Sequence, residues 1–125
     1  FPINFSVTAH DLPSLFGGKS HALLCREYVK GRDWFDFLWY IARKTKPNFK
    51  FLSSALDQQG AWKGKGIEAD VKWYHKEMAK RVKSIDWAKA RADVQRFLRP
   101  VDVKTLELWN ADFILMNLKR LESII

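Results

Sequence analysis

The sequence has few cysteines and no long apolar run, so it lacks the features of a disulfide-rich secreted protein or a membrane-spanning protein. Cys25 is the single cysteine, so no disulfide can form within the chain, and a reducing compartment, the cytoplasm, is the simple expectation. No apolar run approaches the roughly 20 residues that span a bilayer, so we expect no membrane partner.

Metal-binding patterns are also missing. The three histidines have no ligand spacing among themselves or with Cys25, so no metal site is expected in this chain. Two aspartates separated by one residue, the usual way to hold two magnesium ions for phosphoryl transfer, occur nowhere. No P-loop, GxGxxG or Ser/His/Asp pattern is present either.

The composition is that of a folded and basic domain. The 125 residues are 47% hydrophobic and include six tryptophans and nine phenylalanines, which excludes a disordered chain. Lysine and arginine outnumber aspartate and glutamate by 22 to 14, a net charge of +8. Such an excess attracts polyanions, with nucleic acid the common case, although a basic surface can also serve solubility alone.

Hydrophobic periodicity predicts a mainly α-helical single domain over residues 11–125, with about five to six helices. Asp11 and Asp86 are expected helix caps, and glycine or proline should end several of the helices. The expected helices cover about 12–27, 32–44, 48–59, 67–84, 86–99 and 106–125. The second of these is apolar around most of its girth, so it should lie at the centre of the fold.

Residues 1–10 have the alternating pattern of one half-buried strand. A lone strand leaves its edge groups unpaired, so it would pair with a missing upstream domain or a second chain, or the segment would be merely extended. The chain also begins at Phe1 rather than methionine. Processing, trimming of a tag and excision from a longer protein all fit this start.

Lys19 is a charge within the apolar stripe of the first expected helix. Its side chain could simply reach from the stripe to water. Alternatively, it could bind phosphate at the mouth of a cleft. Gly17 and Gly18 favour the second interpretation, because their missing side chains leave room for a ligand or another backbone.

Asp33 and Asp36 lie three residues apart and share one face of the second expected helix. Asp33 is in the first turn, where the helix dipole favours a negative charge, and Arg26 or Arg32 could pair with it. A buried Asp36 would need a partner, and Lys19 is the natural one for either aspartate. Such a pair could be structural or could orient the lysine toward phosphate.

The fourth expected helix combines lysines with aromatic residues. Lys72, Lys76 and Lys80 could contact a nucleic-acid backbone while the aromatics stack on bases. The competing interpretation places Trp73 in the core and leaves the lysines merely solvated, and it is the more common outcome.

The segment LPSLFGGKSHALLCREYVKGRDWFDFLWYIARK resembles the carboxy-terminal part of the AbiEii/AbiGii toxin family of nucleotidyltransferases. The later VQRFLRPVDVKTLELWNADFILMNLKRL is similar to the closing helices of that family. The resemblance extends from about Val7 to Leu121. The glycine-serine turn and the Asp-x-Asp metal site of the family's catalytic half are both missing here.

The resemblance implies the toxin half of a bacterial abortive-infection toxin–antitoxin pair. Such an enzyme would transfer nucleotides from an NTP with Mg²⁺, in some members onto RNA such as tRNA, and an antitoxin protein would be its partner. This chain would be the helical half, without cofactors of its own and inactive without its upstream catalytic domain. The alternative is a free-standing basic helical module that binds nucleic acid or an antitoxin and performs no chemistry.

The resemblance also assigns residues. Lys19 corresponds to the functional lysine of the family, and either Asp33 or Asp36 corresponds to its late aspartate, so these three are the expected catalytic residues. The expected nucleotide- or RNA-binding residues are Lys19, Arg26, Lys30, Arg32, Lys72, Lys76 and Lys80.

Overall fold

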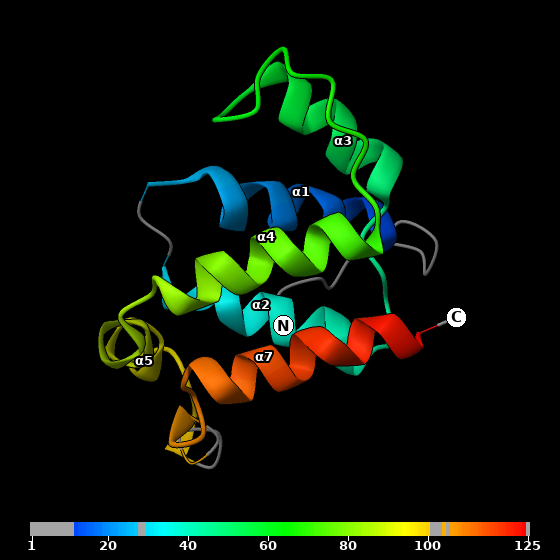
Figure 1. Ribbon diagram of the computed structural model, residues 1–125. Coiled ribbons are helices and arrows are strands. Elements are labelled where there is room, and N and C mark those ends of the chain that lie inside the picture. Colours follow the sequence, from blue (N-terminus) through cyan, green and yellow to red (C-terminus); the bar gives the residue numbers. More distant parts are fainter. Residues whose placement is uncertain (1–11, 28–29, 101–103, 105, 125) are drawn as a thin grey trace.

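The computed structural model describes residues 12–27, 30–100, 104 and 106–124, and this part of the chain is helical (Figure 1). Its elements are α1 (Leu12–Cys25), α2 (Gly31–Ala42), α3 (Phe49–Gln58), α4 (Val71–Lys83), α5 (Trp87–Gln95), α7 (Ala111–Arg120) and a 3-10 helix, η2 (Leu121–Ser123). The predicted mainly helical fold is confirmed. The predicted strand over 1–10 and the predicted cap Asp11 lie outside the described residues.

Four helices form a closed ring of contacts around the core. Helix α1 packs on α2, α2 on α7, α7 on α4, and α4 back on α1. Helix α3 packs on α1 and α5 packs on α2, so these two helices lie outside the ring at opposite ends of the molecule (Figure 1). Helix α2 therefore contacts three others, as its nearly continuous apolar surface predicted. None of the described helices is long and apolar enough to cross a membrane.

Short polar side chains set where most of the helices begin. In four helices the side-chain oxygen of the preceding residue accepts a hydrogen bond from a backbone N–H in the first turn, which satisfies a donor that the helix itself cannot. The four capping residues are Asn48 for α3, Asp70 for α4, Asp86 for α5 and Asn110 for α7. The predicted cap Asp86 is confirmed.

Two of these caps shorten helices that the sequence pattern extended too far. The helix predicted over 67–84 begins only at Val71, because Asp70 caps it. The final helix, predicted over 106–125, begins at Ala111 after the cap Asn110, and it tightens into η2 at Leu121. Apolar residues on both sides of each cap had made the pattern look continuous.

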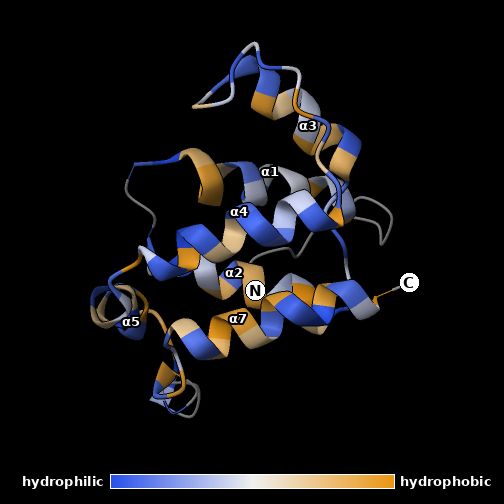
Figure 2. Ribbon diagram, viewed as in Figure 1, coloured by the Kyte–Doolittle hydropathy of each residue, from blue (hydrophilic) through white to orange (hydrophobic). Residues whose placement is uncertain are grey.

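The core is rich in aromatic rings. Phe16 of α1 stacks on Tyr40 of α2 at 4.7 Å between ring centroids, and Trp34 meets Trp87 of α5 edge-on at 5.2 Å. The Tyr74 hydroxyl is fully buried and shares a hydrogen bond of 2.7 Å with Ser20. Apolar residues recur once per turn along α4 and α7 with polar residues between them, so each of these helices turns an apolar face to this core (Figure 2).

Two glycines allow helices to approach each other closely. A Cβ on Gly17 would lie 3.2 Å from the Asn48 carbonyl oxygen, where the start of α3 crosses α1. Gly31 is the first residue of α2, and a Cβ there would overlap the Ala90 carbonyl oxygen of α5. Both glycines therefore serve helix packing.

Candidate functional site

Three charged side chains meet where α1 packs on α2. The Lys19 ammonium of α1 lies 2.8 Å from Asp33 Oδ1 and 3.0 Å from Asp36 Oδ2, and both carboxylates belong to the first two turns of α2. The sequence predicted that Lys19 would pair with one aspartate or the other, and it pairs with both. Because Asp33 and Asp36 are three residues apart on a helix, one ammonium can reach the two carboxylates together.

Lys19 is held in its charged form. Burial alone would lower the pKa of this lysine, but hydrogen bonds and charge from Asp33 and Asp36 outweigh burial, so its pKa lies above the ordinary value. The side chain retains 23% of its surface exposed. An ammonium has three N–H donors, and among the described residues the two carboxylates take two of them. The third donor has no acceptor within the part of the chain that the structure describes.

Asp33 is the anchor of the cluster. It is 6% exposed, and its Oδ2 accepts a hydrogen bond of 3.2 Å from the backbone N–H of Lys30, which caps the start of α2. The Arg26 guanidinium lies 3.6 Å from the same oxygen, as predicted for one of its two candidate partners. Asp33 thus fixes the helix start and the lysine together.

Asp36 lies closer to solvent, and among the described residues its ion-pair partner is Lys19. Burial raises the pKa of the Asp36 carboxyl, and the ammonium of Lys19 and the charge of Arg32 partly oppose that rise. Burial also raises the pKa of Tyr40, and the charge of Asp36 adds to the rise, which places the tyrosine within the electrostatic field of the cluster. Tyr40 was not among the residues that the sequence assigned to the site.

The surroundings of the cluster carry further positive charge. Arg26, Lys30 and Arg32 are exposed beside the two aspartates. Together with Lys19 they outnumber Asp33 and Asp36, but the carboxylates of Glu27 and Asp93 lie at the same helix ends and offset part of this charge. The attraction for a phosphate therefore comes mainly from the individual cations that face solvent beside the cluster.

Asp33 and Asp36 do not fit a magnesium site. The Lys19 ammonium already occupies the position between their oxygens, and a second cation there would be repelled. Across the part of the chain that the structure describes, no three histidine, cysteine or carboxylate side chains gather closely enough to hold a metal ion. The two aspartates therefore hold the Lys19 ammonium and not a metal ion.

Of the two predicted reasons for a glycine, Gly17 bears out the close approach of another backbone and not room for a ligand. Gly17 makes room for the α3 backbone, and a Cβ on Gly18 would meet only the Phe51 ring at an ordinary 3.8 Å. The remaining support for the site comes from the ion cluster and its partial exposure.

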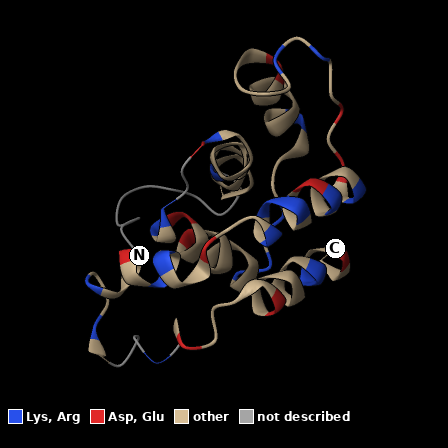
Figure 3. Ribbon diagram, turned by 60° about the vertical axis from the view of Figure 1, so that its left-hand side comes forward, with Lys and Arg blue, Asp and Glu red and all other residues tan. Residues whose placement is uncertain are grey.

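The basic face of α4 is separate from the cluster. Lys72, Lys76 and Lys80 are exposed and spaced along α4 (Figure 3), and Lys80 pairs with Glu77 at 3.3 Å. Trp73 is half-buried and packs edge-on against Trp62 at 5.4 Å, so its ring is partly used in packing. The RNA-binding role of this face stays a prediction.

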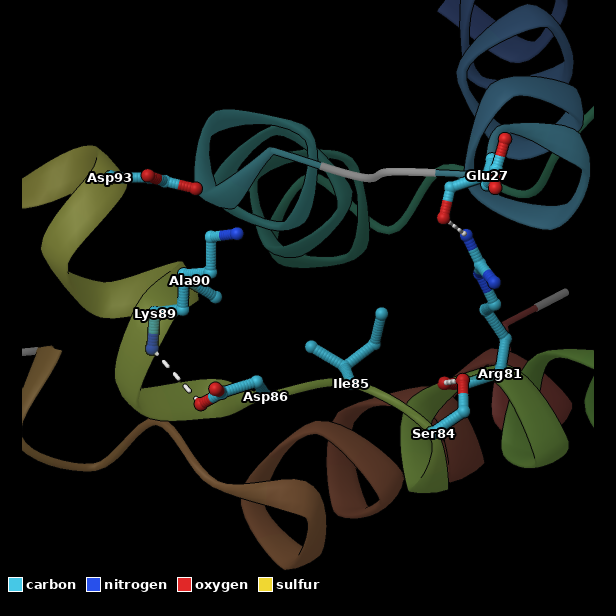
Figure 4. A pocket seen from close by; sticks show the side chains of 8 residues that line it. All are labelled: Glu27, Arg81, Ser84, Ile85, Asp86, Lys89, Ala90 and Asp93. Atoms are coloured by element: carbon cyan, nitrogen blue, oxygen red, sulfur yellow. Dashed lines mark hydrogen bonds between the residues drawn. The ribbon is translucent and has the colours of Figure 1, made fainter.

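A pocket of about 280 Å³ lies between the ends of α1 and α4 and the start of α5 (Figure 4). Its polar groups include several that already have structural tasks. Arg81 donates hydrogen bonds to the carbonyls of Leu23, Arg26 and Glu27 at the end of α1, and Asp86 caps α5. The pocket is a junction of helix ends, and we do not place the functional site in it.

Comparison with known proteins identifies one family. The model of the family described as "Nucleotidyl transferase AbiEii toxin, Type IV TA system" matches residues 1–117 of this chain. Neither the curated proteins nor the solved structures contain a significant match.

Proposed function

The chain belongs to the AbiEii family of nucleotidyl transferase toxins of type IV toxin–antitoxin systems, and we propose that it supplies the helical part of such an enzyme that contacts the nucleotide. In this proposal Lys19 binds the phosphates of an NTP. Asp33 and Asp36 hold the lysine charged and in position. The acceptor is RNA, such as tRNA, and an antitoxin protein controls the toxin.

The cluster of Lys19, Asp33 and Asp36 carries this proposal. Lys19 pairs with two carboxylates rather than one and keeps an exposed edge, so its charge is fixed in position and open to a ligand. Fixing a charge before the substrate arrives lowers the cost of aligning it with the developing charge of phosphoryl transfer. The buried Asp33 holds the lysine from the core side of the cluster. Asp36 contacts the same ammonium nearer to the solvent.

Catalysis by the complete enzyme also requires Mg²⁺, and we propose that residues of an upstream catalytic domain hold it. The metal would supply electrostatic stabilisation of the transferred phosphoryl group. Lys19 would approach the same phosphates from the helical side and add a second positive charge. Residues 1–10 would join the two parts.

The 125-residue chain alone is therefore expected to transfer no nucleotide. Labelled NTPs, Mg²⁺ and total cellular RNA are incubated with this chain, and with a longer protein that includes the upstream domain as a positive control. Label should appear on RNA only with the longer protein. Strong labelling by the 125-residue chain would contradict the division of the enzyme into two parts, and an unlabelled RNA pool in both reactions would contradict the transferase activity itself.

A further inference from the structure

An exposed aromatic ring lies directly after α5. Phe97 has 59% of its surface exposed, although its backbone is held in the turn that follows the helix. Its N–H bonds the Val94 carbonyl at 3.0 Å, and the N–H of Leu98 bonds the Gln95 carbonyl at 3.2 Å. The ring is thus presented to solvent from a well-defined position.

Two arginines flank this ring. The guanidinium carbon of Arg32, at the start of α2, lies 5.2 Å from the ring centroid, and that of Arg96 lies 5.1 Å away. Each distance is within the range of a cation–π contact. Much of the ring stays open, so the two guanidinium groups border it without enclosing it.

An open ring bordered by guanidinium groups suits an unpaired base better than a protein side chain. Bases stack on aromatic rings and on guanidinium planes, and the arginines can also contact the adjoining phosphates. An apolar protein surface would instead have to bury two exposed positive charges next to the ring. The net charge of +8 favours the same polyanionic ligand.

Arg32 connects the ring to the lysine cluster. It precedes Asp36 by one helical turn, and its charge acts on that carboxylate. A strand that stacks on the ring would therefore lie beside the site to which we assign the NTP phosphates.

We propose that Phe97, Arg32 and Arg96 form a stacking platform for an unpaired base of single-stranded RNA. Its place in the reaction, holding the acceptor strand, rests on the proposed function above. Its ability to bind RNA does not.

Binding is tested with the full chain and a fluorescent, unstructured RNA of about ten nucleotides, within the site sizes of single-strand binders. Phe97→Leu should weaken binding about tenfold, because the stacked base loses its aromatic partner. Phe97→Trp should retain the affinity. Met116→Ala is the matched control, since Met116 is 58% exposed on α7 and should not affect binding.

A second probe separates stacking from charge. An abasic strand of the same length should bind weakly and equally to wild type and Phe97→Leu. Arg32→Ala should weaken both probes and reduce the salt dependence, because phosphate contacts are lost. Unchanged RNA affinity in Phe97→Leu would overturn the proposal, and so would an equal loss for both probes. Loss of antitoxin binding with intact RNA affinity would show a protein-docking surface and would overturn it too.

This assay contains neither NTP nor metal. Unchanged RNA binding in Phe97→Leu would contradict the stacking platform but would not affect the proposed role of Lys19. Conversely, failure of Lys19 to bind NTP phosphates would not affect the expected difference between the two RNA probes.

Discussion

Lys19→Met is expected to abolish toxicity and to destabilise the fold, and neutralising both aspartates as well should restore stability without restoring toxicity. The single change leaves Asp33 and Asp36 partly buried beside each other without the ammonium between them. Breaking a fully buried pair costs about 3–5 kcal/mol, and the partial exposure here reduces the expected loss to about 2–3 kcal/mol. Transfer should fall by about 100-fold or more if the lysine stabilises charge that develops in the transition state.

The triple variant Lys19→Met/Asp33→Asn/Asp36→Asn removes all three charges and keeps similar volumes. Replacing a buried ion cluster by neutral side chains is often close to neutral for stability, and asparagine at 33 can still accept the capping hydrogen bond from Lys30. The free energy of unfolding should return to within about 1 kcal/mol of wild type. Toxicity and nucleotide transfer should stay absent.

The matched control is Lys119→Met, at an exposed lysine of α7 that is outside the expected binding residues. Surface substitutions usually change stability by about 0.5 kcal/mol or less, so both stability and toxicity should remain close to wild type. Denaturant unfolding and growth arrest are measured for every variant of the toxin. A toxic triple variant would show that the cluster is purely structural.

Gly31→Ala is expected to be the most destabilising single-methyl change in the described helices. The new Cβ would overlap the Ala90 carbonyl oxygen and lie 2.9 Å from its carbonyl carbon, and both atoms belong to the backbone of α5. No rotamer change can relieve a clash with backbone, so α2 and α5 must move apart. Overpacking in a core costs about 1–3 kcal/mol and occasionally more, and we expect about 3 kcal/mol or more here.

Gly18→Ala is the control for this prediction. Gly18 also lies in a helix, but its Cβ would meet only the Phe51 ring at 3.8 Å. Alanine is favoured over glycine inside a helix by about 1 kcal/mol, so this variant should be stabilised. Thermal and denaturant unfolding of the two variants should therefore shift in opposite directions. A Gly31→Ala protein with wild-type stability would contradict the close approach of α2 and α5.

The sequence was informative wherever the relevant spacing was local. The i, i+3 spacing of Asp33 and Asp36 placed both carboxylates on one face of their helix. Lys19, the charge within the apolar stripe of the preceding helix, was the natural partner for a buried carboxylate. The central place of α2 followed from its apolar girth in the same way. Asn110 was a readable helix-start signal within the last segment, but the strong apolar pattern on both sides outweighed it.

Contacts between distant segments could not be predicted. Gly31 and Ala90 are far apart in the sequence, so the reason for a glycine there appears only when α5 packs on α2. The same holds for Gly17, whose partner is the start of α3 rather than a ligand. The contact between Arg32 and the Phe97 ring likewise joins two segments that are far apart in the sequence.

The central claim is that Lys19 binds the phosphates of an NTP, and equilibrium titration of a nucleoside triphosphate onto the complete toxin tests it most directly. Wild type is compared with the triple variant, after unfolding measurements show that both are equally folded. The account predicts that the triple variant binds at least about tenfold more weakly, the loss of roughly one charge-assisted hydrogen bond. Equal affinity in two equally stable proteins would contradict it.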